Sequence, residues 1–189
     1  LIVDLLQTDT SLCLGDSLLI SIDTLSNLQS NSASVIIVPN DYATIQTAID
    51  SANSNDTIIV MPGTYYENIL WENKNLVIKS YSGKEYTIID GQNLNNVFKI
   101  SGVDSTSLLE GFTIRKGTPM ANSQFPENNG GGILIYSGTN NILLNNLVIE
   151  QCFSGSTGSG LYLHAGSAIM TNSIVRNNLN GGIHLHANA

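Results

Sequence analysis

Charged residues are scarce in this sequence of 189 residues. They make up 12% of the chain, whereas about a quarter is usual in soluble domains. The seven lysines and arginines are scattered along the sequence, and fifteen acids outnumber them, so the net charge is −8. Because phosphate backbones and anionic membrane surfaces bind clustered basic side chains, these counts argue against nucleic acid or a membrane as a partner.

Long apolar runs and cysteines are also scarce. No stretch approaches the length of a membrane-spanning helix. Residues 1–6 lack the methionine and the basic residues of a signal peptide, so we expect a chain that begins inside a longer product. The two cysteines, Cys13 and Cys152, form no metal-binding spacing. We expect both to be buried as small apolar side chains, and the sequence predicts neither a metal site nor a cofactor.

The apolar residues that are present make up 42% of the chain, which is enough for a core. Many of the polar positions carry Asn, Ser, Thr or Gly. This composition favours short strands joined by polar turns, because Asn and Gly adopt positive φ values at low cost.

Residues 1–34 differ from the rest of the chain. A predicted strand at 17–22 precedes a Ser/Asn-rich stretch, 24–34, that is typical of a linker. Residues 12–20 resemble the Cys-x-Gly-Asp-Ser strand opening of Ig-like modules in large secreted bacterial surface proteins. We therefore interpret 1–34 as the remnant of a preceding β segment with its linker, and 35–189 as a separate domain that is incomplete at its C-terminal end.

One helix is predicted, at 41–52. Ile45, Ala48, Ile49 and Ala52 recur with the spacing of one helical face, and the residues at 39–41 supply a breaker and an N-cap. Short strand candidates then follow without further helices, each bounded by polar turn residues. They lie at 57–61, 76–79, 86–89, 97–101, 112–115, 133–136, 147–150, 161–164, 174–176 and 183–186.

Two families of short repeats interleave along the chain. Similar pentapeptides occur at 75–79, 111–115, 146–150 and 172–176, and a second family occurs at 132–136, 160–164 and 182–186. This pattern predicts an all-β fold, a right-handed single-stranded parallel β-helix, whose coils add rungs about 4.8 Å apart to two parallel sheets. The helix at 41–52 would cover the N-terminal end of the stack, and 118–129 would project as a loop.

The segments 42–49, 56–60 and 63–69 resemble the N-terminal cap and first coil of pectin-lyase-like β-helix proteins. The element Gly-x-Tyr-x-Glu-x-Ile at 63–69 is shared with pectin methylesterases and other secreted β-helix proteins, and 89–91 and 111–115 are also familiar there. The resemblance covers about 36–186 and implies the same fold in a secreted, extracellular or cell-surface bacterial protein. It leaves the activity open, because the superfamily includes lyases, hydrolases, esterases, epimerases and non-catalytic adhesins.

The catalytic signatures of these enzymes have no counterpart in the sequence. The acids after Glu110 are only Glu127 and Glu150, too few for a paired-carboxylate site. We therefore expect a structural or adhesion scaffold that contacts a polysaccharide or a cell-surface glycan. The alternative is the N-terminal part of a polysaccharide-degrading enzyme, a uronate lyase or a pectinesterase-like protein, with catalytic residues beyond this segment; a lyase would imply Ca²⁺.

Two outward-facing columns of side chains are predicted from the alternation of the strands. The first is a charged column of Lys79, Arg115, Glu150 and Arg176. We interpret it as a ladder of salt bridges, and a polyuronate-binding or catalytic row is the alternative. The second is a candidate glycan-binding strip, whose alternative is ordinary stacking of side chains on neighbouring rungs. Its residues are Tyr136, Tyr162, His164, His184 and His186.

Two structural expectations complete the prediction. Asn146 and Asn172 occupy matched positions, so their amides are expected to form a turn ladder. The segment 181–186 opens another coil without a helix to cover it. We therefore expect further coils of the same chain, or a stacked subunit, against that end.

Overall fold

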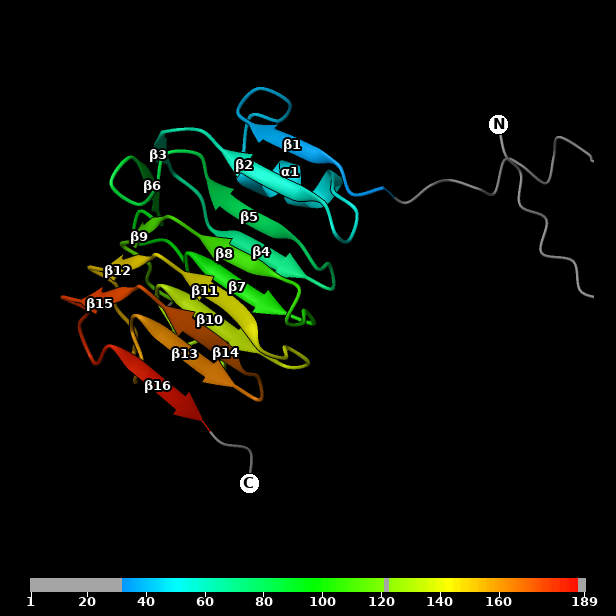
Figure 1. The fold of residues 1–189 in the computed structure, drawn as a ribbon. Helices are drawn as coiled ribbons and strands as arrows, with labels where there is room; N and C mark the ends of the chain where they lie inside the picture. The colour runs from blue at the N-terminus through cyan, green and yellow to red at the C-terminus, as the bar shows by residue number, and fades with distance from the viewer. Residues whose placement is uncertain (1–31, 121–122, 187–189) are drawn as a thin grey trace, which may run out of the picture. The chain divides into compact units, whose positions relative to one another are not determined.

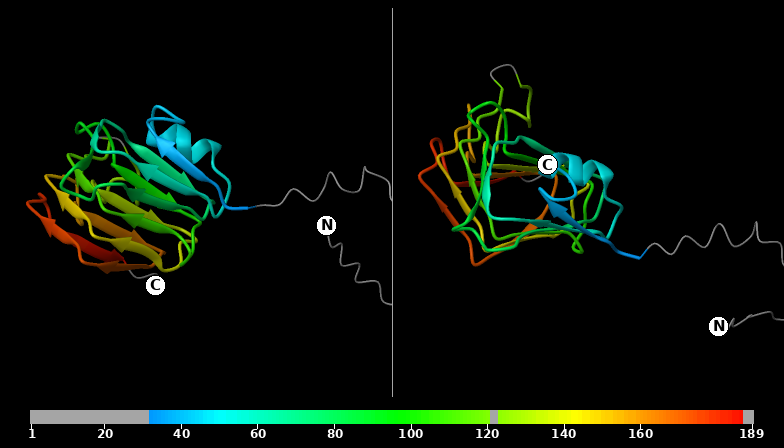
Figure 2. Two further views of the ribbon diagram at one scale, coloured as in Figure 1. Left: turned by 45° about the horizontal axis from the view of Figure 1, so that its top comes forward. Right: turned by 90° about the horizontal axis from the view of Figure 1, so that it is seen from above.

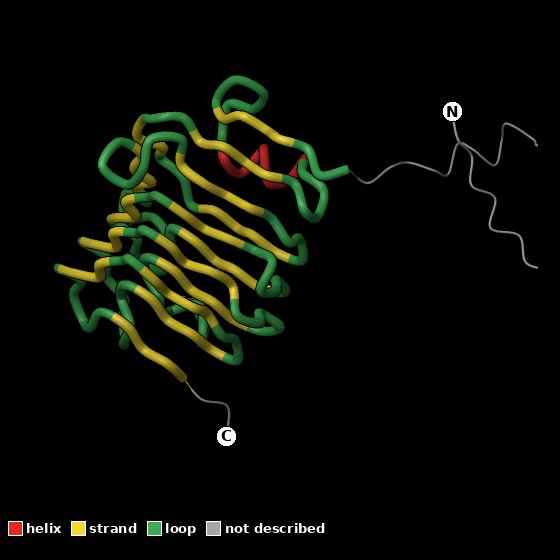
Figure 3. The backbone as a smooth tube through the Cα atoms, in the orientation of Figure 1, coloured by secondary structure: helices red, strands yellow, loops and turns green. Residues whose placement is uncertain are grey.

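The computed structural model describes residues 32–120 and 123–186. These residues are mostly strands in parallel sheets, with one α-helix, and the figures show the helix at the opposite end of the stack from the last strand (Figures 1 and 3). The strand predicted at 17–22, Cys13 and all of the predicted linker before Ser32 lie outside the described residues.

The strands form three sheets, and neighbouring strands within each sheet are parallel. Sheet A contains β1 (Val35–Val38), β2 (Thr57–Val60), β5 (Val77–Ser80), β8 (Leu108–Glu110), β11 (Ile142–Asn145) and β14 (Ala168–Thr171). Sheet B contains β3 (Gly63–Tyr65), β6 (Thr87–Asp90), β9 (Thr113–Arg115), β12 (Val148–Glu150) and β15 (Ile174–Arg176). Sheet C contains β4 (Ile69–Glu72), β7 (Phe98–Ser101), β10 (Ile133–Tyr136), β13 (Leu161–His164) and β16 (Ile183–His186).

The chain visits the sheets in a constant order. From β2 onwards it passes through sheets A, B and C five times, and we call each passage a circuit. Seen from above, the sheets surround a common interior (Figure 2). The prediction of two sheets was therefore wrong: there are three. All ten predicted strands occur, whereas β1, β3, β4, β8, β11 and β14 were missed.

The predicted helix is confirmed as α1 (Ile45–Ser51), but its N-cap differs from the prediction. Thr44 Oγ1, rather than a residue at 39–41, accepts a hydrogen bond of 3.1 Å from the Thr47 amide. The Glu67 carboxylate accepts two more, from the amides of Ile45 and Gln46, each 2.9 Å long. These bonds satisfy N–H groups that a helix leaves free in its first turn. The buried face of α1 packs on β1, β2 and β4.

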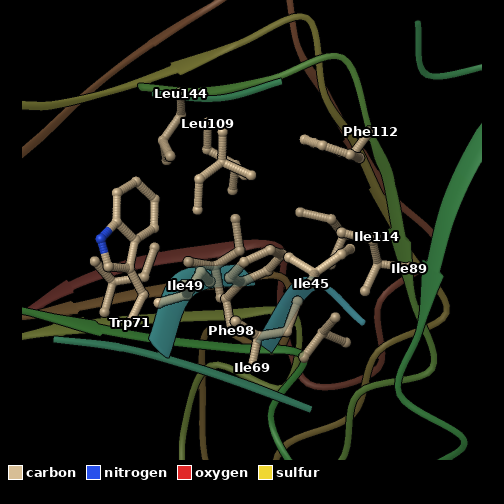
Figure 4. Packing of buried hydrophobic residues seen from close by; sticks show 14 of the residues in the cluster. Ile45, Ile49, Ile69, Trp71, Ile89, Phe98, Leu109, Phe112, Ile114 and Leu144 are labelled. Carbon is tan, nitrogen blue, oxygen red and sulfur yellow. The ribbon is translucent and has the colours of Figure 1, made fainter. Parts of the chain in front are cut away.

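The core lies between the three sheets and beneath α1. Trp71, Phe98 and Phe112 are its largest buried side chains, and Figure 4 shows them pointing into the interior together with aliphatic side chains from α1 and all three sheets. The Trp71 indole donates a hydrogen bond of 2.7 Å to the Lys74 carbonyl. Cys152 is buried as predicted, and this burial raises the pKa of its thiol to about 11.

The last two turns from sheet A to sheet B begin with asparagine. Asn146 and Asn172 have φ values of 51° and 52°, and each begins the short link from its sheet A strand to the next sheet B strand. The Asn172 amide donates to Asn145 Oδ1 at 3.0 Å. The side-chain contact thus joins Asn172 to Asn145, and not to Asn146 as predicted.

Candidate functional site

The outer face of sheet C carries the two predicted columns of the glycan strip. Strand register aligns Leu134, Tyr162 and His184 in one column. It aligns Tyr136 with His164 and His186 in the other. Towards the α1 end, the first column continues with Lys99 and Leu70, and the second with Ser101 and Glu72.

A loop covers part of this face. The connection from β9 to β10 is described at 116–120 and 123–132, and these parts project from the body in the right-hand view of Figure 2. Leu134 and Tyr162 are only 0% and 2% exposed, although they point away from the core. The prediction that Tyr162 lies open on the strip was therefore wrong, and a ligand cannot lie flat on its ring.

Phe125 brings this loop onto the predicted strip. Its ring meets His164 edge-on with centroids 4.7 Å apart, His186 at 5.3 Å and Tyr162 at 6.5 Å. Tyr162 and His184 are stacked at 5.2 Å with an interplanar angle of 5°. We call these five side chains the aromatic cluster. Phe125 is 54% exposed, and sequence reasoning missed it because the segment 118–129 shows no periodicity from which an orientation could be predicted.

Several contacts hold this loop in place. The Asn96 side chain donates to the carbonyls of Asn129 and Gly130, at 2.6 and 2.7 Å. Lys99 forms an ion pair of 2.9 Å with Glu127. A Cβ atom at Gly117 would lie 1.8 Å from the Gly131 carbonyl oxygen, so the two ends of the loop are in backbone contact. Phe125 is thus presented by an anchored loop with a narrow base.

A hydrogen-bonded acid lies beside the cluster on the same face. Glu72 Oε1 accepts from the Tyr136 hydroxyl at 2.8 Å and from the Ser101 hydroxyl at 3.1 Å. Burial, together with the Glu72 carboxylate, raises the pKa of the Tyr136 phenol. Tyr136 therefore remains protonated and fixed at neutral pH. His164 Nδ1 is buried and, within the described residues, has no hydrogen-bond partner.

Metal chemistry finds no support at this site. Within residues 32–120 and 123–186, no group of three or more His, Cys, Asp or Glu side chains is placed to hold an ion. Glu72 is bonded to two hydroxyls and Glu127 to Lys99, so both acids are already engaged. The site offers ring faces and edges, which suit stacking against the C–H faces of a sugar.

The charged column lies on sheet B, and one of its predicted members was wrong. Register aligns Asp90, Arg115, Glu150 and Arg176 on successive strands. Lys79 belongs to β5 of sheet A instead, where it is aligned with Ile59 and Glu110. Asp90 occupies the position that sequence comparison gave to Lys79.

Salt bridges join two pairs of neighbouring strands in the sheet B column, but among the described residues none joins Arg115 to Glu150, so the predicted ladder is not continuous. Arg115 Nε lies 2.7 Å from Asp90, Lys116 Nζ lies 3.2 Å from the same carboxylate, and Arg176 Nε lies 2.9 Å from Glu150. The Asp90 carboxylate is 2% exposed. Burial acts to raise its pKa, but hydrogen bonds from the Gln92 amide, Arg115 and Lys116 outweigh burial and lower it.

This lowered pKa predicts a loss of stability in acid. A carboxylate whose pKa is lower in the folded state than in the unfolded state stabilises the fold at pH values above its ordinary pKa. This contribution is lost as the pH falls through the pKa of the folded state. Asp90→Asn should lower the free energy of unfolding by about 1.5–3 kcal/mol at pH 7 and by much less in acid. Urea unfolding at neutral and at acidic pH measures both. Glu85→Gln, which alters an exposed acid, is the control, and equal losses from the two variants would contradict the prediction.

No family model matches the chain, and no solved structure matches it. Among the described residues, no helix is both long enough and apolar enough to span a membrane.

Proposed function

We propose that residues 35–186 form a right-handed parallel β-helix of the pectin-lyase-like kind, in an extracellular or cell-surface bacterial protein that contacts glycans. The constant order of the three parallel sheets supports the β-helix. The right-handed sense follows from the general rule that crossovers between parallel strands are right-handed in about 98% of cases. The position of α1 over β1, β2 and β4 fits a capping helix.

The exposed ring of Phe125 against two imidazoles carries the glycan-binding proposal. Phe125, His184 and His186 present partly open rings within one small area, held by buried Tyr162 and by the fixed loop. Sugars bind such surfaces through their C–H faces, and their hydroxyls reach neighbouring polar groups. Tyr136 and His164 extend this surface along the column of His186. The protein then acts as a scaffold that displays a binding surface.

Exposed core-facing residues support the expected neighbour at β16. Ile183 and Leu185 are aligned with buried Leu161 and Leu163, yet they are 51% and 70% exposed. A further coil of the chain or a stacked subunit would bury them. Such coils would also be the place for catalytic residues in the alternative function, a uronate lyase or a pectinesterase-like enzyme.

Binding to arrayed polysaccharides tests the scaffold function. Phe125→Ala and His186→Ala should each weaken the binding of a retained glycan about tenfold, because each removes one stacking surface. Tyr81→Ala removes a 69% exposed ring from the loop between β5 and β6 and should leave binding unchanged. An array without any retained glycan, or unchanged binding by both variants, contradicts the proposal. Release of unsaturated or de-esterified product from a polysaccharide would favour the enzyme instead.

A further inference from the structure

A groove of about 450 Å³ runs along the outer face of sheet B, away from the aromatic cluster. Its floor is the column beside the salt bridges, where Ile88, Thr113, Val148 and Ile174 follow one another in register. The charged column forms one wall, and Lys84 and Glu85 form the other. The groove is therefore built from four successive circuits.

Lys84 fixes the second wall. Its carbonyl accepts a hydrogen bond of 2.8 Å from the Thr113 hydroxyl. Its ammonium donates at 3.3 Å to the carbonyl of Asn172, which lies just before β15. The side chain thus extends along the stack, from the loop before β6 towards the last circuit, and it holds a positive charge beside the groove.

The net charge of this face is opposite in sign to that of the whole chain. The net charge of the protein is −8, yet four of its seven basic residues, Lys84, Arg115, Lys116 and Arg176, belong to this face or its salt bridges. Against them stand Glu85, Glu150 and the buried Asp90, which leaves a local balance of +1 from four positive and three negative charges. Four of the basic residues, from three separate parts of the sequence, are thus gathered on one face.

The arginines keep donors available for a ligand. A guanidinium carries five N–H donors, and the bond from Arg176 to Glu150 uses Nε. The Arg176 side chain is 55% exposed, whereas Arg115 is held more tightly on Asp90. A guanidinium with free terminal donors binds carboxylate or sulfate oxygens in a planar, two-pronged arrangement.

The floor of the groove favours a sugar chain over an extended peptide. The backbone groups of β6, β9 and β12 pair with strands on both sides, and β15 pairs with β12 at the edge of the sheet. The face of the sheet, where the groove lies, therefore offers no ladder of partners to the amides of a peptide. Sugar rings need no such ladder, because their C–H faces pack on aliphatic side chains. Their hydroxyls can donate to carboxylates such as Glu85 and Glu150, which accept hydrogen bonds only.

We propose that this groove is a second glycan site, which binds an acidic oligosaccharide along the stack through its carboxylate or sulfate groups. Arg176 and Lys84 bind the acid groups. Arg115, held by its salt bridge to Asp90, fixes the wall that the charged column forms. The aliphatic floor packs against the sugar rings. The site is separate from the aromatic cluster and does not depend on it.

Three dextrans that share one backbone test the proposal by titration calorimetry at low salt. Carboxymethyl-dextran, dextran sulfate or both should bind, and uncharged dextran should not. Added salt should weaken the binding, because the contacts are partly exposed. Arg176→Gln and Lys84→Gln should each weaken it about three- to fivefold. Lys79→Gln removes the same charge from sheet A and should have no effect.

Several results would overturn the second site. They are equal binding of uncharged dextran, no binding of either acidic dextran, unchanged binding in both Arg176→Gln and Lys84→Gln, or an equal loss in Lys79→Gln. Tighter binding of single-stranded DNA than of both acidic dextrans would indicate a nucleic-acid surface instead. Phe125→Ala should leave acidic dextran binding intact, so this site and the aromatic cluster can fail independently. Circular dichroism of each variant confirms that the fold is retained.

Discussion

Gly131→Ala is expected to lower the free energy of unfolding by more than about 3 kcal/mol. A Cβ atom on Gly131 would lie 2.1 Å from the Phe153 carbonyl oxygen and 2.6 Å from that of Gly117. Both neighbours are backbone atoms, so no side chain can rotate away. The Gly131 carbonyl also accepts a hydrogen bond of 2.9 Å from the Val97 amide, which resists a shift of the segment.

Urea unfolding measures this loss, and Gly155→Ala is the matched control. No atom lies within 4 Å of a Cβ placed at Gly155. The control should therefore stay within about 0.5 kcal/mol of the parent, or become slightly more stable. If Gly131→Ala behaved like the control, the close contact at the base of the loop would be wrong. Because this base carries Phe125, the substitution should also weaken the glycan binding that we propose for the aromatic cluster.

Trp71→Ala should cost about 3–5 kcal/mol, because it leaves a large cavity in the core. Trp71 is fully buried beside α1, and its indole N–H satisfies the Lys74 carbonyl. Removing the ring deletes apolar contacts and leaves that carbonyl without its partner. The free energy of unfolding in urea again gives the size of the loss.

Leu70→Ala tests the same strand on its outer face. Leu70 adjoins Trp71 but is 44% exposed, so its loss should change the free energy of unfolding by about 0.5 kcal/mol or less. Trp71→Phe should fall between the two, since it keeps an aromatic ring and loses the N–H donor. Similar losses from Trp71→Ala and Leu70→Ala would contradict the inward position of the indole.

Most strands of sheets B and C could be predicted from sequence because they repeat with clear boundaries, although β3 and β4 were missed. Most strands of sheet A could not. Asn146 turns the chain so tightly that only two residues separate β11 from β12, and only the second of these two strands was predicted. The match of 75–79 to the sheet B repeats, which misplaced Lys79, has a different cause. A five-residue pattern of alternating apolar residues fits any of the three sheets.

The columns of the candidate site were predictable, but the contacts across them were not. In parallel strands of equal register, Tyr136, His164 and His186 must align once their repeats align. Phe125 and Glu72 could not be assigned to the site without knowing which distant segments of the chain come together. The position of Phe125 depends on how its loop packs, and Glu72 meets Tyr136 from 64 residues away. Neither residue belongs to a repeat.

In the proposed function, the exposed residues of β16 would link assembly to recognition. In stacked folds each layer contacts only its neighbours, so the layer with exposed core residues is the first to lose order. That layer supplies Arg176 to the sheet B groove and His184 and His186 to the aromatic cluster. A neighbour that covers Ile183 and Leu185 would stabilise both surfaces at once. By thermodynamic reciprocity, a bound glycan would then strengthen the attachment of that neighbour by the same factor.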